Sequence, residues 1–440
     1  MITILSEDKL KELAGEIWLS GESRNNLTYL TDELKNRFAG TESEHKAADY
    51  VESKFREYGL EEVELEEFEF QGWQRGSTSL SVFGQDFTAV ALPYCPPGAI
   101  KGELIDLGDG LEEDFERDIQ DKIVMVTSHT PTYRKRWLHR GEKYSYTVNG
   151  GAKGFLFINH YPGNLPPTGS LRSDRIGEIT GIGISKEVGS RIKRALRRQG
   201  ELNATIEVDA GTDKAVSHNV IGKLNPDSDR PAILVGGHLD GHDISQGAED
   251  NGAGVTTVVE MARALAPYAD EIERPIYFAA FGAEELGLIG SKRYVEKNGV
   301  SDLGLVLNCD GPGRARDLKF ITNGFRDLAD KIEEYTPEDE SPPKIEDRIS
   351  AHSDHWPFVK QGLPGCQISP DTGEQGRGWG HTSADTLDKI DFRNIKQNAI
   401  TLAQLVLKFS SEGLGVEKKT PEEIKQQIKE EGREEEVDWL

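Results

Sequence analysis

Apolar residues in the second half of the chain gather in three short, nearly continuous runs. These are AILVGGH (232–238), PIYFAAFG (275–282) and LGLVLNCD (303–310). Segments with helical spacing of apolar positions, 252–266 and 286–297, lie between and after them. Strands that are apolar on both faces and alternate with helices predict an α/β sheet covered on both sides.

The first 75 residues show a different pattern. In SEHKAADYVESKFREYG (43–59) the apolar residues recur at helical spacing and a glycine ends the run, which predicts an amphipathic helix. In VELEEFEF (63–70) apolar residues are interleaved with glutamates, as in a half-exposed strand.

Between residues 76 and 215 the pattern changes again. Short β-type runs, KIVMV (122–126) and GFLFIN (154–159), stand among turns rich in Gly and Pro, and SKEVGSRIKRALRRQG (185–200) is a helix candidate. These features predict a compact mixed domain inserted between two parts of another.

The predicted division of the chain therefore has four parts. They are an N-terminal part of the main domain (1–75), the insert (76–215), the main part with the site (216–412) and a charged helical tail (413–440). In the tail, Thr420 and Glu423 form a capping box before a helical segment.

Composition narrows the function classes. The chain has 440 residues and a formal net charge of −25, so nucleic acid is not an expected partner, because phosphate binding needs a basic surface. The three cysteines, Cys95, Cys309 and Cys366, do not suggest a disulfide framework. No apolar run is long enough to cross a bilayer. We expect a soluble cytoplasmic protein with no membrane partner, and the sequence leaves a homodimer open.

Histidines and carboxylates follow the predicted strand ends. The residues are His238, Asp240, Asp250, Glu284, Glu285 and Asp310, with His381 in a later loop. One acidic residue at a strand end is more often a helix cap or a solvated loop residue, but several at successive strand ends favour a shared site. Imidazoles and carboxylates without thiolates suit zinc, cobalt or manganese in a hydrolytic site.

These motifs also resemble a known family. HLD, GAEDNGAG, FGAEELGLIGS, NCDGPG, SDHWPF and HTSADTLDKID occur in the order found in the zinc-dependent exopeptidases that include bacterial leucine aminopeptidase and plasma glutamate carboxypeptidase, and RFAGTESEHKAADYV matches as well. In the insert, DIQDKIVMV, GGAKGFLFINH and ITGIGISKEVG resemble a protease-associated domain. The resemblance implies a mixed, mostly parallel sheet sandwiched by helices, with an inserted mixed α/β domain.

The resemblance also implies roles for the strand-end residues. His238 and Asp310 would hold one zinc ion, Glu285 and His381 a second, and Asp250 would bridge the two. Relatives have a cis peptide bond after the bridging residue, so we expect one between Asp250 and the next residue.

Two further roles come from the resemblance. Asp240 would hold the ring nitrogen of His238 that faces away from the metal, and Glu284 would be the general base. The expected cofactor is two Zn²⁺ per chain, replaceable by Co²⁺ or Mn²⁺, with a bridging hydroxide as the nucleophile.

The implied activity is removal of N-terminal residues from peptides or cleavage of dipeptides. Two alternatives remain at this point. One is a single-zinc enzyme like glutaminyl cyclase, and the other is a non-catalytic peptide-binding or receptor protein on the same scaffold.

Several nearby residues have simpler interpretations. We expect His242, Asp243 and Glu249 to be loop residues, and His352 and His355 to be packed or hydrogen-bonded rather than ligands. Cys309 is expected to be a buried apolar residue and not a nucleophile.

The basic stretch YRKRWLHRGEK (133–143) stands out in an acidic chain. A solvated loop is the simpler interpretation, and contact with a substrate carboxylate is the functional one, through Arg134, Lys135, Arg136 and Arg140. We also expect the insert to lie over the metal site as a partial lid.

Overall fold

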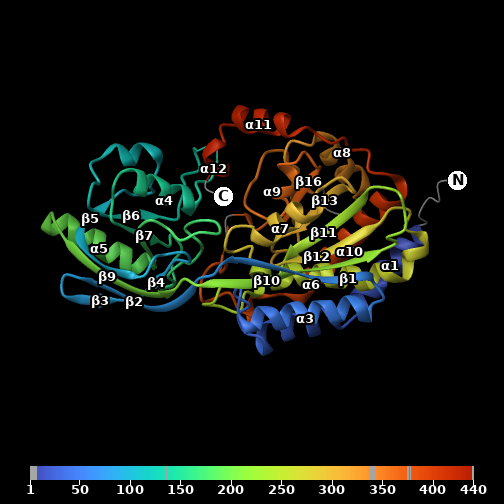
Figure 1. Cartoon of the computed structure of the whole chain (residues 1–440), viewed down its shortest axis with the longest axis horizontal. Coiled ribbons are helices and arrows are strands. Elements are labelled where there is room, and N and C mark those ends of the chain that lie inside the picture. Colours follow the sequence, from blue (N-terminus) through green and yellow to red (C-terminus); the bar gives the residue numbers. More distant parts are fainter. Residues whose placement is uncertain (1–6, 135, 337–342, 374–375, 377, 439–440) are drawn as a thin grey trace.

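The computed structural model describes residues 7–134, 136–336, 343–373, 376 and 378–438. The strands in this part of the chain form two eight-stranded sheets, which lie beside each other along the long axis of the molecule (Figure 1). In spatial order, the first sheet consists of β1 (Glu61–Gln71), β10 (Lys214–Leu224), β12 (Ile276–Phe281), β11 (Ala232–His238), β13 (Leu303–Cys309), β16 (Gly365–Pro370), β14 (Leu318–Ile321) and β15 (Lys344–Glu346).

The four middle strands of the first sheet, β12, β11, β13 and β16, are parallel, and β1 and β10 are antiparallel to their neighbours. Every residue of β11 is buried. Ile233 and Val235 pack into the main core, and Leu234 between them packs into a second cluster on the opposite face. The predicted fold, a mixed sheet covered by helices on both faces, is confirmed.

Helices cover this sheet from two sides (Figure 1). On the side of the main core lie α1 (Glu7–Leu19), α2 (Glu22–Thr28), α3 (Glu42–Glu57), α6 (Ala253–Leu265) and α10 (Phe392–Glu412), with α8 (Arg326–Tyr335) packed on α10. On the other side lie α7 (Ile289–Asn298) and α9 (Trp356–Val359). The predicted helix over 43–59 corresponds to α3, whose apolar face is buried.

The second sheet belongs to the middle of the chain. Its strands in spatial order are β3 (Gln85–Phe87), β2 (Gln74–Val82), β9 (Asn203–Gly211), β5 (Gly98–Asp106), β6 (Ile123–Thr127), β7 (Gly154–Ile158), β8 (Thr180–Ile184) and β4 (Ala89–Ala91). With α4 (Arg140–Asn149) and α5 (Lys186–Gln199) it has its own buried core. This membership supports the proposal that residues 76–215 form an insert between 1–75 and 216–412.

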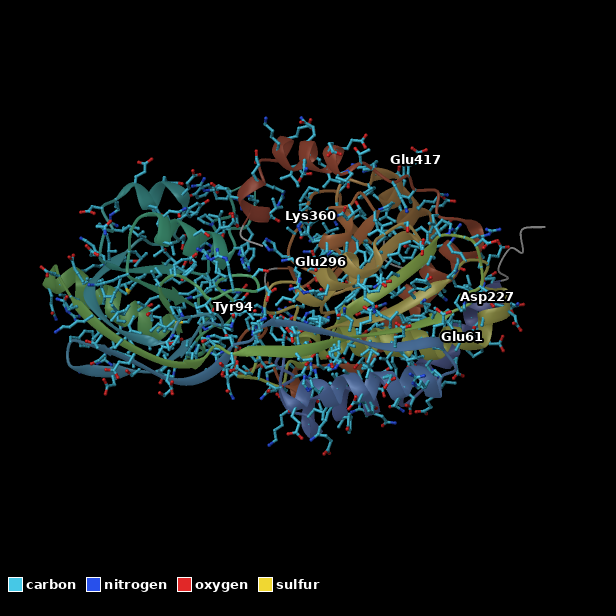
Figure 2. The ribbon with its side chains drawn as sticks, viewed as in Figure 1. Glu61, Tyr94, Asp227, Glu296, Lys360 and Glu417 are labelled. Carbon is cyan, nitrogen blue, oxygen red and sulfur yellow. The ribbon has the colours of Figure 1, made fainter. Side chains whose placement is uncertain are left out.

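The chain passes between the two sheets twice, from β1 to β2 and from β9 to β10. Tyr94, labelled in Figure 2, lies close to this junction and is fully buried. Its hydroxyl donates a hydrogen bond to the Gln71 carbonyl at the end of β1, at 2.8 Å. The insert is therefore attached to the first sheet by side-chain contacts as well as by the two connections.

The tail folds as predicted into α11 (Pro421–Glu430), where Thr420 and Glu423 form the capping box. A short helix, α12 (Glu434–Asp438), follows and lies between the two parts of the molecule (Figure 1). We propose that residues 413–440 form a separate tail segment. None of the helices in the described ranges is long and apolar enough to span a membrane.

Candidate metal centre

The parallel strands of the first sheet end at one edge, and the candidate residues lie there. His238 is the last residue of β11, Glu284 and Glu285 follow β12, and Asp310 follows β13. Together with Asp250 and His381, they line a cavity of about 60 Å³, which is called the metal cavity below. This is the edge at which open α/β sheets place their sites.

Asp250 lies between two histidines. Its Oδ1 is 3.2 Å from Nε2 of His238, and its Oδ2 is 3.2 Å from Nε2 of His381. Nε2 of His238 is also 3.9 Å from Oδ1 of Asp310, and Nε2 of His381 is 3.2 Å from Oε2 of Glu285. One carboxylate thus faces two ligand groups with a different oxygen toward each.

The backbone beside Asp250 has the predicted geometry, because the Asp250–Asn251 peptide bond is cis. The Asn251 side chain connects this residue to the end of β13. Its Nδ2 donates to the Cys309 carbonyl at 2.8 Å, and its Oδ1 accepts from the Gly311 amide at 2.9 Å. Asp250 and Asp310 are therefore held in relation to each other by one amide side chain.

Two residues that the sequence analysis did not single out also position this loop. The Asp385 carboxylate accepts the amides of Glu249 and Asp250 at 2.7 and 3.1 Å. The fully buried Arg37 donates to the carbonyls of Leu239, Gln246 and Gly247. Both residues lie inside motifs that carry the family resemblance, but the residue type alone gave no reason to select them.

Asp240 contacts both His238 and the backbone that carries the two glutamates. The hydrogen-bonding distance to Nδ1 of His238 belongs to the Asp240 backbone carbonyl, at 3.1 Å, whereas the carboxylate Oδ1 is 3.7 Å away. The two carboxylate oxygens instead accept the amides of Glu284 and Glu285, at 2.9 and 3.1 Å. Asp240 thus holds the backbone of both glutamates, because a buried carboxylate needs donors of this kind.

His242 departs from its interpretation as an ordinary loop residue. It lies in a loop, but it is buried, and its Nε2 is 2.9 Å from Oε2 of Glu285. Among the described residues, neither of its ring nitrogens has a partner that meets hydrogen-bond geometry. Ligand atoms of His242, Glu285 and His381 lie within 4.8 Å of one another, as do those of His238, Asp250 and Asp310.

The other two predicted loop residues are also held in place. Asp243 accepts two hydrogen bonds from Arg75 of β2, both at 2.7 Å, and so joins the metal loop to the insert. Glu249 is buried, and Arg314 lies 3.6 Å from its Oε2. The glycine-rich loop is therefore not a solvated one.

The environment shifts the pKa values of Glu284 and Asp250 in opposite directions. Burial raises the pKa of Glu284 well above its usual value, and Glu285, Asp354 and Asp310 add to the rise against the opposing charge of His238. For Asp250, burial works in the same upward direction, but His238 and His381 outweigh it and lower the pKa well below its usual value. Separated pKa values of neighbouring carboxyls are typical of sites that divide proton transfer from charge stabilisation.

The donor set fits zinc. It consists of imidazole nitrogens and carboxylate oxygens without thiolates, which zinc accepts. Within the described residues, Oε1 of Glu285 and Nδ1 of His242 are buried without a hydrogen-bond partner, and a buried polar atom in that state needs an explanation such as a bound ion.

The remaining candidates agree with their simpler interpretations. The buried His355 ring lies 2.9 Å from the Ser350 carbonyl through Nε2, and His352 stacks on His139 of the insert while lining the metal cavity. Cys309 is fully buried, and burial raises the pKa of its thiol to about 12, which excludes it as a nucleophile near neutral pH.

The insert contributes His139, Arg140 and Ser170 to the wall of the metal cavity. Arg140 is itself engaged, because its guanidinium donates to the carbonyls of Ser170 and Thr168 at 2.9 and 3.3 Å. Of the other cations in the basic stretch, Arg134 pairs with Glu113 and Arg136 with Glu142, and Lys135 lies outside the described residues.

A second cavity of about 400 Å³ adjoins the metal cavity, sharing Arg140 and His381 with it. Its wall includes the apolar surfaces of Trp137, Phe157 and Pro167. An apolar pocket beside a metal cavity is a suitable place for a substrate side chain.

Comparisons with known proteins agree with this geometry. Residues 219–406 match Peptidase family M28, and residues 95–192 match the PA domain. The chain is 30% identical over 427 residues to Aminopeptidase YwaD of Bacillus subtilis (strain 168), which covers 92% of this chain and 86% of that protein. The chain belongs to peptidase family M28.

Solved structures of similar proteins include BSAP, a zinc aminopeptidase from Bacillus subtilis, with a TM-score of 0.67 and 27% identity over 90% of this chain and 95% of that one. An aminopeptidase from Aneurinibacillus sp. strain AM-1 has the same TM-score of 0.67 and 25% identity, covering 92% of this chain and 97% of that one. The predicted family, the inserted PA domain and the hydrolase class of this M28 peptidase are confirmed.

Proposed function

We propose that this M28 peptidase is a zinc aminopeptidase that uses two zinc ions to remove N-terminal residues from peptides or to split dipeptides. The observation that carries the proposal is the position of Asp250, whose two oxygens face His238 and His381 separately. The named zinc aminopeptidase among its relatives supports the same activity.

The proposed ligand groups follow from the distances. His238 and Asp310 would hold one ion and Glu285 and His381 the other, with Asp250 between them. His242 offers the second group another nitrogen. Zinc held by these residues would lower the pKa of the attacking water and polarise the scissile carbonyl.

Glu284 is the proposed general base. It lines the metal cavity, and burial together with the neighbouring carboxylates raises its pKa. Glu284 takes the proton of the water that adds to the carbonyl carbon, and it delivers this proton to the amine nitrogen as the C–N bond breaks. Asp240 keeps Glu284 in place through the backbone and acts as a positioning residue.

The alternatives make different predictions for metal content. A single-zinc enzyme would need only one of the two groups, and a binding protein would not need a base in the cavity. Zinc per chain should therefore be measured by elemental analysis and compared with hydrolysis of leucine p-nitroanilide. Two zinc ions with hydrolysis support the proposal; a single ion, or two ions without hydrolysis of any aminoacyl substrate, would contradict it.

A further inference from the structure

A third cavity, of about 460 Å³, opens beside the metal cavity. Asp310 and His352 line both cavities. A substrate group bound in the third cavity would therefore lie next to the proposed metal ligands. It would belong to a substrate residue beside the scissile bond. We call this cavity the cationic pocket, because several arginines and a lysine line it.

Basic side chains line much of the pocket. They are Arg134, Arg136, Lys319, Arg348 and Arg433, whereas the acidic lining residues are Asp310 and Glu436. In the whole chain the ratio is the reverse, with 52 Lys and Arg against 77 Asp and Glu. A concave site lined by one sign of charge raises the local concentration of ligands of the opposite sign.

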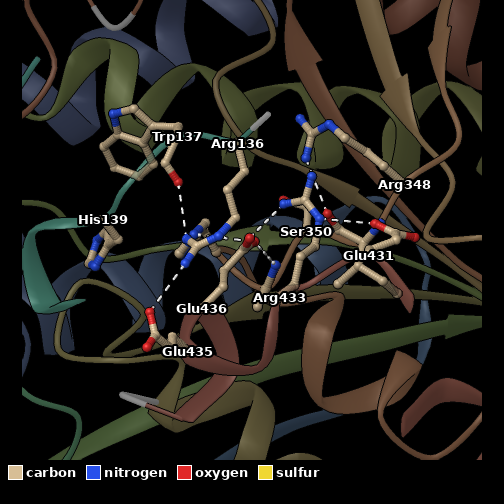
Figure 3. A network of polar contacts seen from close by, with 12 residues as sticks. Arg136, Trp137, His139, Arg348, Ser350, Glu431, Arg433, Glu435 and Glu436 are labelled. Atoms are coloured by element: carbon tan, nitrogen blue, oxygen red, sulfur yellow. Dashed lines mark hydrogen bonds and ion pairs between the residues drawn. The ribbon is translucent and has the colours of Figure 1, made fainter. Parts of the chain in front are cut away.

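Most of these arginines have partners that hold the walls together (Figure 3). Arg136 pairs with Glu142 at 2.6 Å and lies 3.7 Å from Glu435 of α12, which joins the insert to the tail. Arg433 pairs with Glu431 at 2.9 Å and with Glu436 at 2.5 Å.

Glu436 is also attached to the first-sheet side of the pocket, because its Oε1 accepts the Ala351 amide at 3.3 Å. The network of arginines and glutamates thus joins three segments that are far apart in the sequence. These pairs build the walls of the pocket and neutralise the arginines together with the glutamates.

Lys319 is the exception among the lining cations. It is on β14, and no hydrogen bond or ion pair is found for its ammonium group among the residues that the structure describes. Burial lowers its pKa, and Arg348 and Lys344 add to the effect against the charge of Glu346. Arg348, which also lines the pocket, has Nε 2.9 Å from Oε2 of Glu346 and one Nη donating to the Ile349 carbonyl.

Glu346 and Asp371 act on this ammonium through space, but no described residue pairs with it directly, so a ligand carboxylate in contact with it would supply the missing ion pair. Ser350 and Ser369 add hydroxyl groups to the same wall. The lining is therefore suited to an anionic group with several acceptor oxygens. The cavity of about 400 Å³, by contrast, is lined in part by aromatic and apolar surfaces, although it shares Thr130 and Trp137 with the cationic pocket.

We propose that the cationic pocket binds a carboxylate of the substrate, with Lys319 as its main charge partner and Arg348 beside it. The inference rests on the proposed peptidase function and names the substrate class, peptides with a carboxylate close to the scissile bond. That carboxylate comes either from an acidic side chain or from the free C-terminus of a very short peptide.

Four substrates separate these sources: glutamate p-nitroanilide, leucine p-nitroanilide, a free Leu-Leu dipeptide and its C-terminal amide. The measured quantity is the ratio of kcat/KM for the carboxylate-bearing member of each pair to that of its neutral counterpart. In Lys319→Met at least one ratio should fall by about 10- to 100-fold, mainly through KM, as expected for a lost charge-assisted hydrogen bond. The pair whose ratio falls identifies the source.

Lys344→Met is the matched control. Lys344 is the register partner of Lys319 on the neighbouring strand β15, but it is half-exposed and pairs with Asp371 at 3.1 Å. The Lys344→Met variant should leave both kcat/KM ratios unchanged. Lys319→Arg, which keeps the charge, should restore most of the preference.

Two results would overturn the proposal: unchanged ratios in Lys319→Met, or an equal change in Lys344→Met. If the wild-type protein cleaves none of the four substrates, the proposed function fails separately. The pocket is then tested by calorimetric titration of the zinc-loaded protein with glutamate and with leucine, where loss of a glutamate preference in Lys319→Met supports it and absence of any wild-type preference refutes it.

Discussion

The metal centre and the cationic pocket share Asp310 but are built in opposite ways. The candidate metal centre collects carboxylates and imidazoles from the ends of parallel strands and, for Asp250 and His381, from segments farther along the chain, and each lies in a short motif. The pocket collects cations from the insert, from β14, from the loop at 348 and from the tail. One site is thus produced by strand topology, and the other by the packing of distant segments.

The difference also has a consequence for substrate orientation. The acidic side of the cleft suits the ammonium group of a peptide N-terminus, and the basic side suits a carboxylate. In our proposal a substrate that carries both charges lies across Asp310, with its amine toward Glu284 and Glu285 and its carboxylate toward Lys319. The two sites then act together in choosing short or acidic peptides.

Removal of the proposed bridging carboxylate, Asp250, should have the largest effect. In Asp250→Ala both ligand groups lose an oxygen, so we expect zinc content to fall for both ions and hydrolysis to fall to background. Elemental analysis and leucine p-nitroanilide hydrolysis measure the two effects. Retention of two tightly bound zinc ions in this variant would show that Asp250 does not bridge.

Glu284→Gln tests proton transfer separately from metal binding. The variant keeps the shape and the backbone contact with Asp240, so zinc content should stay at the wild-type value while kcat falls by about 10²- to 10⁴-fold. Glu285→Gln is the companion variant, and it should lose zinc instead. If Glu284→Gln loses zinc and Glu285→Gln keeps it, the two roles are exchanged.

His242→Phe tests whether the second ligand group includes a residue that the motifs did not reveal. Phenylalanine fills similar space but offers no nitrogen, so affinity for the zinc ion proposed to bind Glu285 and His381 should fall by about 10- to 100-fold. Competition with a chelator of known affinity measures this change without reference to activity. Unchanged zinc affinity would reduce His242 to a packing residue.

Glu436→Gln tests how the acidic residues of the cationic pocket affect its preference for a substrate carboxylate. It removes the acidic charge that neutralises Arg433, while the amide oxygen can still accept the Ala351 amide. The kcat/KM ratio for glutamate over leucine p-nitroanilide should therefore rise by about threefold, the size expected for one modest charge interaction. A fall in that ratio would mean that the tail contributes shape and not charge balance.

Glu44 is a buried carboxyl near Asp240. Its replacement should give the smallest effect, a change in how the stability of the fold depends on pH. Burial raises its pKa from 4.5 to about 8, opposed by the hydrogen bond from Ser217. Between these two pH values the folded protein binds the proton that the unfolded chain releases, so this group makes the free energy of unfolding fall as pH rises.

Glu44→Gln removes that contribution. Denaturant unfolding at several pH values from 5 to 8.5, at one free zinc concentration, should show a smaller decline with pH in the variant than in the wild-type protein. An equal decline in both would mean that Glu44 keeps its ordinary pKa in the folded state.

Much of the fold and most residues of the candidate site could be predicted from sequence. β11 and β13 are buried along their whole length, so their apolar runs were visible, and parallel strands necessarily end together at one edge. His238 and Asp310 therefore had to be neighbours once the strands were recognised. The backbone carbonyl of Asp240 lies nearer to His238 than its carboxylate does. Residue type does not encode this detail of local geometry.

The sequence by itself determined which residues stand at the strand ends, because apolar periodicity and the alternation of strands with helices are local properties. Only the tertiary structure decided that His242 is buried against Glu285 and that Lys319 faces the same pocket as Arg348 and Arg433. The burial of a polar residue and the pairing of a charged one depend on which distant segments pack around it. No pattern within a short stretch of chain records that packing.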